Sequence, residues 1–163
     1  MVVLVLKYLV ENRSLTRGRP NRIGHALVSA AGNGHIDVVK YLVETGMENW
    51  DLMRELLSGS NKIENALVRA ARNNCHEIVK YLVETGMKDG NFVKAISNVM
   101  GRIFTQAAQN GHTEILGYLL RAGMKDEDLV AILSSRMGDA LVRTARNRCL
   151  VAMECLVEMG MES

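Results

Sequence analysis

The segment at 26–47 recurs almost unchanged at 66–87, and both copies end in the same letters, KYLVETGM. Two weaker copies begin at residues 103 and 140, and a partial copy at 2–12 matches the second half of the unit. Self-similarity at such a period is typical of repeat arrays, in which each unit buries its apolar side against the next. The sequence therefore predicts a single repeat domain over 1–163.

Within this domain we place an N-terminal half repeat at 1–12, an irregular basic loop at 13–25, and full repeats at 26–65, 66–102, 103–139 and 140–163. The chain has one proline, and aromatic residues make up only 4% of it. This balance favours helices over strands, so we expect an all-α fold.

Each full repeat begins with a pattern typical of two helices joined by a tight turn. We expect the first helix of the second repeat to be capped by Asn65 and to begin at Ala66. A residue with left-handed backbone should then end each first helix. The residues in that place are Gly34, Asn74, Gly111 and Arg148, and the arginine predicts a strained or altered turn.

The second helix of each repeat carries an apolar stripe, such as Val38, Val39, Leu42 and Val43, and ends in a Gly-Met pair. We expect these glycines to be left-handed, with the methionine packing back on the last turn of its helix. The glycines concerned are Gly46, Gly86, Gly123 and Gly160.

The segments that join the full repeats carry an apolar pattern of their own, which predicts a short third helix of about two turns. Its apolar positions are Leu52, Met53 and Leu56, then Phe92, Val93 and Ile96, then Leu129, Val130 and Leu133.

The strings AAGNGHIDVVKYLVETG and AAQNGHTEILGYLLRAG resemble the ankyrin repeat, and the resemblance covers nearly the whole chain. Two features depart from the family: the Thr-Pro-Leu-His start is absent, and most repeats exceed the usual 33 residues. The resemblance implies an ankyrin-like helical solenoid, here with the short third helix in place of most β-hairpins. An armadillo or HEAT solenoid is the alternative. The resemblance also implies that His35 and His112 are structural residues bonded to local backbone.

No phosphate loop, dinucleotide fingerprint, metal-ligand spacing or nucleophile motif occurs in the sequence. Cys75 and His76 form the one close thiol and imidazole pair, but adjacent residues on a helix point about 100° apart. We therefore expect no enzyme, no metal and no cofactor.

The resemblance implies that a partner protein binds the inner face of the stacked first helices. By position, the candidate partner-binding residues are Ser29, Asn33, Arg69, Arg72, Asn73, Gln106, Gln109, Asn110, Arg143, Arg146 and Asn147. The arginines would attract an acidic partner, although a solvated polar face is an equal interpretation. The asparagines are open to a second reading as helix caps.

An RNA-binding solenoid is the alternative function, using the arginine-rich face and the loop residues Arg13, Arg17, Arg19 and Arg22. The net charge is only +2 and no aromatic residues interleave these arginines, so we do not expect nucleic acid as the partner.

The apolar opening is too short for a signal peptide or a membrane span, and the three cysteines form no disulfide framework. We expect an intracellular, cytoplasmic chain that binds no membrane. The opening helix and the final helix at 150–159 are unusually apolar, so either these repeats are a segment of a longer array or another copy or another protein covers the two ends. Of these we expect self-association.

Overall fold

The computed structural model describes residues 22–57, 62–88, 90–123 and 127–161, and within these ranges the regular elements are all α-helices. They are α2 (Arg22–Gly32), α3 (Ile36–Glu48), α4 (Trp50–Leu57), α5 (Lys62–Arg72), α6 (His76–Lys88), α7 (Gly90–Asn110), α8 (Thr113–Gly123), α9 (Glu127–Arg146) and α10 (Leu150–Met161). The all-α expectation is confirmed. The half repeat at 1–12 and most of the basic loop lie outside the described residues.

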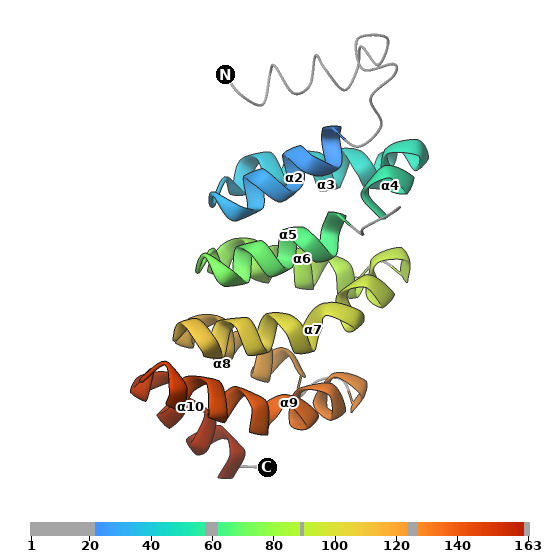
Figure 1. Ribbon diagram of the computed structural model, residues 1–163. Helices are drawn as coiled ribbons and strands as arrows, with labels where there is room; N and C mark the ends of the chain where they lie inside the picture. The colour runs from blue at the N-terminus through green and yellow to red at the C-terminus, as the bar shows by residue number, and fades with distance from the viewer. Residues whose placement is uncertain (1–21, 58–61, 89, 124–126, 162–163) are drawn as a thin grey trace.

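The helices form a stack of two layers (Figure 1). In one layer α2, α5, α7 and α9 pack side by side in that order, and in the other α3, α6, α8 and α10 do the same. We call the first set the first helices and the second set the second helices. Equivalent segments of successive repeats therefore adjoin each other, as the repeated sequence predicts.

The core lies between these layers and is built from the repeated apolar positions. The small pair Ala70 and Ala71 is fully buried in α5, and so is its counterpart Ala107 and Ala108 in α7, which lets consecutive first helices approach closely. Phe104, the largest fully buried side chain, fills the space between layers. Each unit thus depends on its neighbour to cover its apolar side.

The starts of the first helices differ from the prediction. Helix α2 begins at Arg22, inside the segment expected to be an irregular loop, and α5 begins at Lys62, so Asn65 lies within the helix and not at its N-terminus. The reason is packing: Ile63 is 1% exposed, and burying it against the neighbouring repeat stabilises a helical turn that the cap signal did not mark.

The third helix exists as a separate element only where α4 stands between α3 and α5. In the next two repeats it runs without a break into the following first helix, which gives the long helices α7 and α9. The short third helix is therefore confirmed at one connector and corrected at the other two. No proline or glycine-rich turn separates the two patterns there, so the backbone hydrogen bonds continue.

The Gly-Met prediction was wrong in its geometry. Gly46 and Gly86 lie inside α3 and α6, Gly123 is the last residue of α8, and α10 continues past Gly160. None of the first three has a positive φ. A Cβ at Gly46 would lie 2.8 Å from Leu56 Cδ1, and one at Gly123 would lie 2.6 Å from Leu133 Cδ1.

These glycines make room for a leucine of the segment that folds back over the helix end. Of the methionines that follow, Met47 is 42% exposed and Met87 is 36% exposed, so neither belongs to the fully buried core.

The turns after the first helices match the prediction. Gly34 and Gly111 have φ of 77° and 73°, and Asn74 and Arg148 have φ of 59° and 57°. Arg148 therefore holds a left-handed backbone in spite of its Cβ.

Candidate functional site

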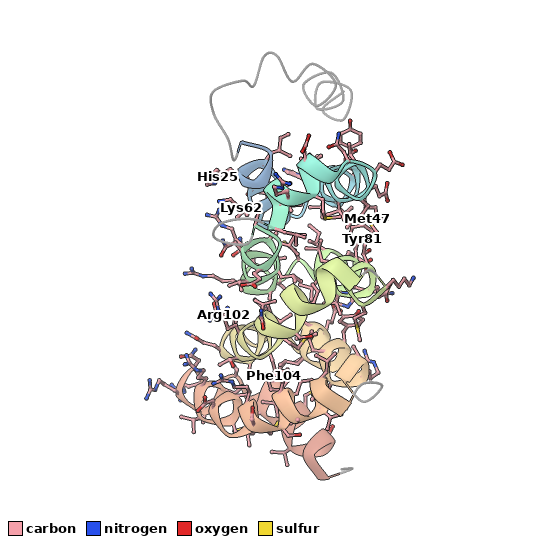
Figure 2. All side chains as sticks on the ribbon, turned by 90° about the vertical axis from the view of Figure 1, so that its right-hand side faces the viewer. His25, Met47, Lys62, Tyr81, Arg102 and Phe104 are labelled. Atoms are coloured by element: carbon pink, nitrogen blue, oxygen red, sulfur yellow. The ribbon has the colours of Figure 1, made fainter. Side chains whose placement is uncertain are left out.

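The candidate residues do come together on the stack. Ser29 lies on α2, Arg69 and Arg72 on α5, Gln106 and Gln109 on α7, and Arg143 and Arg146 on α9, and these helices are consecutive neighbours. The two glutamines are half-buried and the other five side chains are exposed. We call this surface of the first helices the row face. Figure 2 shows Arg102 on the side of the stack formed by the first helices and Tyr81 on the opposite side.

The asparagines that follow each first helix form a hydrogen-bond ladder between repeats. Asn73 Nδ2 donates to the carbonyl oxygen of Gly32 at 2.7 Å, and Asn147 Nδ2 donates to that of Gln109 at 2.7 Å. Asn110 Nδ2 makes the same bond more weakly, at 3.4 Å, with the carbonyl oxygen of Arg72.

In the first repeat the bond stays within the repeat, because Asn33 Nδ2 donates to the carbonyl oxygen of Ser29 at 2.8 Å. These bonds satisfy carbonyl groups that helix ends leave without partners. The asparagines thus act as helix caps: Asn73, Asn110 and Asn147 each bond a carbonyl oxygen at the end of the first helix of the preceding repeat. Because their amide groups are already engaged, they are weaker candidates for partner binding than the arginines.

Histidine and cysteine share one position next to this ladder, which the sequence analysis did not recognise. His112 Nε2 lies 3.0 Å from the carbonyl oxygen of Arg72. That partner belongs to the preceding repeat, so the expected bond to local backbone is corrected. Cys75 Sγ and Cys149 Sγ lie 4.0 and 3.8 Å from the carbonyl oxygens of Gly32 and Gln109. Aligning the four repeats would have revealed this position, which is His35 in the first repeat.

Burial disfavours the thiolate form of Cys75 and Cys155. Burial raises the pKa of Cys75, and burial together with the nearby Glu158 carboxylate raises the pKa of Cys155. A raised pKa keeps a thiol protonated and a poor nucleophile. His76 is directed elsewhere, with its ring edge-on to Tyr118 at a centroid distance of 6.1 Å and its Nδ1 3.6 Å from Glu77.

Two arginines of the row face contact the preceding repeat, Arg69 through its stem and Arg143 through its guanidinium group. A Cβ at Gly32 would lie 2.8 Å from Arg69 Cδ, so the Arg69 stem crosses the end of α2 where a side chain is missing. In the last repeat Arg143 Nη1 donates to Gln109 Oε1 at 3.1 Å, and Gln106 Nε2 donates to the same oxygen at 3.1 Å. Such stems bury apolar area while the charged group faces water.

A groove of about 340 Å³ opens on this surface between α5, α7 and α9. Its lining residues are Val68, Gly101, Arg102, Thr105, Gln106, Arg136, Asp139 and Arg143. Gln106 and Arg143 belong to the predicted rows, whereas Arg102, Arg136 and Asp139 do not. They were missed because the first helices were expected to begin at Ile103 and Ala140, and α7 and α9 begin earlier. The spacing of Arg102, Gln106 and Gln109 along one helix face is the signal that could have found the groove.

The groove contains more positive than negative side chains. Arg136 Nη1 lies 3.7 Å from Asp139 Oδ2, and both side chains are more than half exposed, so this ion pair contributes little stability. The Arg136 stem lies over Gly101, where a Cβ would be 3.1 Å from Arg136 Cγ. Within the described chain no hydrogen bond or ion pair engages the guanidinium group of Arg102. Three arginines therefore face one carboxylate.

The two layers also differ in total charge, mainly through α5 and α7 in one layer and α3 and α10 in the other. The first helices carry nine lysines and arginines and four carboxylates, whereas the second helices carry four cations and eight carboxylates. Although the net charge of the chain is only +2, the layer of first helices is basic and the layer of second helices is acidic. A field of this kind attracts anionic partners to the row face.

A second hollow, of about 440 Å³, lies beside the turns and is lined by Gly34, Ile36, Asn74, Cys75, His76, Glu77, Ile78 and Glu114. Across the residues that the structure describes, no three metal-binding side chains gather at one place. Nor does any helix in that part of the chain have the length and apolarity needed to cross a membrane.

Comparison with protein families gives one match, in which a family model of ankyrin repeats in three copies covers residues 47–129. Searches of curated proteins and of solved structures gave no match.

Proposed function

Because this chain belongs to the ankyrin-repeat family, whose repeats are generally protein–protein interaction modules and typically non-catalytic, we propose that it binds a partner protein on the row face. The observation that carries the proposal is the set of exposed arginine side chains on α5 and α9, of which Arg69 has its stem packed over Gly32 and Arg143 donates a hydrogen bond to Gln109.

The charge of the row face supports an acidic partner. Arginine is enriched at protein interfaces because its planar group forms paired hydrogen bonds with carboxylates. A stem already held against the preceding repeat loses less conformational freedom when the partner binds. Arg69 and Arg143 meet both conditions.

RNA is the second candidate, and the described residues favour it less. Proteins that bind single strands combine basic grooves with aromatic side chains on which bases stack. On this chain Tyr41, Tyr81 and Tyr118 lie on the second helices, and Phe104 is fully buried. The loop residues Arg13, Arg17 and Arg19 lie outside the described residues.

A quadruple charge reversal tests the proposal. The variant replaces Arg69, Arg72, Arg143 and Arg146 by glutamate and serves as bait in a capture experiment from cell lysate, read by mass spectrometry. A matched control replaces Lys40, Lys80, Lys88 and Arg121, four exposed cations of the second helices, by glutamate.

The row-face variant should lose the partners that the unchanged chain captures, and the control should keep them. Circular dichroism must show both variants helical. If both variants capture the same partners as the unchanged chain, the row face is not the binding surface.

We also propose self-association, on a separate observation. Ala145 is exposed although its counterparts Ala71 and Ala108 in preceding repeats are fully buried, and Val157 is 46% exposed although its counterpart Val83 is buried. The surface of α9 and α10 thus has the apolar character of a face that elsewhere in the stack is covered by a neighbouring repeat. A second copy of this chain offers a face of the same kind.

A further inference from the structure

The groove between α5, α7 and α9 identifies the kind of acidic partner that the row face is built for, an inference that rests on the proposed function. We propose that it takes an extended segment with a carboxylate at every third residue, and that the middle carboxylate enters the groove beside Arg102. The groove offers Arg102, Arg136 and Arg143 against the single carboxylate of Asp139, so its charge is complementary to such a segment.

The spacing follows from the packing of the first helices. Three consecutive first helices each carry a cation on this surface, namely Arg69 on α5, Arg102 on α7 and Arg143 on α9. Arg102 lies one helical turn before Gln106, the residue of α7 equivalent to the other two arginines. Packed helices lie about 8–10 Å apart. A polyproline II segment rises about 3.1 Å per residue and completes a turn in three residues, so every third side chain points the same way, about 9 Å further on. Its period therefore matches the distance from one repeat to the next.

An amphipathic helix fits this surface poorly. A helix that docks in a groove needs an apolar track for its anchors at positions i, i+3, i+4 and i+7. In the groove Val68 is the single large apolar side chain that lines it, and it is half-buried. The remaining lining is charged, polar or glycine, which suits the exposed backbone of an extended segment.

A single carboxylate suits the groove by its geometry. Asp139 lies in the lining and pairs with Arg136, which leaves Arg102 and Arg143 to bind a partner. A planar carboxylate can accept paired hydrogen bonds from such guanidinium groups. The net positive charge of the groove attracts a phosphate as well, so the oligouridine probe described below serves to distinguish a nucleic-acid backbone from an acidic peptide.

Fluorescence anisotropy with synthetic peptides tests the inference. The probe is a labelled peptide of four Glu-Pro-Ser units, and its comparison peptide has the same composition with the four glutamates placed together. At about 0.1 M salt, charges further apart than about 10 Å are screened, so spacing is read more strongly than total charge. The spaced peptide should bind about tenfold more tightly, because misregister removes at least one charged hydrogen bond.

Two variants locate the site. Arg102→Gln should weaken binding of the spaced peptide about tenfold, whereas Arg121→Gln, the same change on α8, should leave it unchanged. Asp139→Asn should strengthen binding several-fold, because it removes the opposing carboxylate and releases Arg136. Glutamine has nearly the same helix propensity as arginine, so the arginine variants should keep the fold.

Equal binding of the two peptides, or an unchanged affinity of Arg102→Gln, would overturn the inference. Tighter binding of a peptide with glutamates seven residues apart would replace the extended segment by a helix. Tighter binding of a labelled ten-residue oligouridine, lost in Arg102→Gln, would assign the groove to nucleic acid. If the quadruple row-face variant loses its partners from lysate while the spaced peptide fails to bind, the row face remains the interaction surface and only the groove's occupant is wrong.

Discussion

Arg148 should destabilise the chain through its backbone alone, and replacing it by glycine should stabilise the fold. Its φ of 57° lies in the left-handed region, which costs a residue with a Cβ about 1–2 kcal/mol. Glycine removes that cost but loses about 0.5–1 kcal/mol more conformational entropy on folding. The net expectation for Arg148→Gly is a gain of up to about 1.5 kcal/mol in the free energy of unfolding, or up to about 6 °C in Tm for a chain of this size.

Arg148→Ala is the matched control, because it removes the same charge and side chain but keeps the Cβ. Urea unfolding followed by circular dichroism should show a higher midpoint for Arg148→Gly than for Arg148→Ala, with equal slopes. Gly111→Ala should do the opposite at the equivalent turn, where φ is 73° and a Cβ would lie 3.2 Å from Cys149 Sγ. A glycine variant no more stable than the alanine variant would refute the assignment of strain to this turn.

Three further outcomes are expected. Asn73→Ala should lower the free energy of unfolding by about 1 kcal/mol in urea titrations, because it removes the bond to the Gly32 carbonyl oxygen. Burial, with the Glu84 carboxylate nearby, raises the pKa of Tyr118 to about 12, so stability in urea should fall as pH rises from about 10 to 12, and Tyr118→Phe should reduce this fall. The double variant Val151→Lys and Val157→Lys should show a lower mass by light scattering at high concentration; a monomeric unchanged chain would remove the proposed self-association.

The turns after the first helices could be predicted from sequence because their requirement is local. Whether a residue can adopt a left-handed backbone depends mainly on its own Cβ and side chain. Gly34, Gly111 and Asn74 can therefore be identified from their residue types alone. The same local reasoning identified Arg148 as an exception before any coordinates were considered.

The glycines that end the second helices could not be read in this way. A glycine near a helix end fits a left-handed cap and a close contact equally well in sequence. Leu56 and Leu133 decide the matter at Gly46 and Gly123, and their approach depends on how the next segment folds back. The approach of these leucines is a property of tertiary packing. The sequence therefore shows that a glycine recurs at this position but not that it recurs to admit a leucine side chain.

The groove escaped prediction for a related reason. Arg102 and Arg136 fall in segments assigned to connectors, and only the continuation of α7 and α9 carries them onto the face of the first helices. Once the helices are continuous, the ordinary spacing of helical neighbours places Arg102 with Gln106 and Gln109. Because α7 and α9 were expected to begin later than they do, Arg102 and Arg136 were not predicted to line the groove.

A test of the proposed binding role of Arg69 must separate it from the packing of its side chain. The Arg69 stem covers Gly32 while its charged group faces outward, so Arg69→Glu changes the packing as well as the charge. Arg69→Met keeps most of the stem and removes only the guanidinium group. If Arg69→Met unfolds in urea like the unchanged chain but loses the acidic peptide, the stem serves the stack and the charge serves the partner. If Arg69→Met binds as well as the unchanged chain while Arg69→Glu does not, the reversed charge repels the peptide and Arg69 itself makes no contact with it.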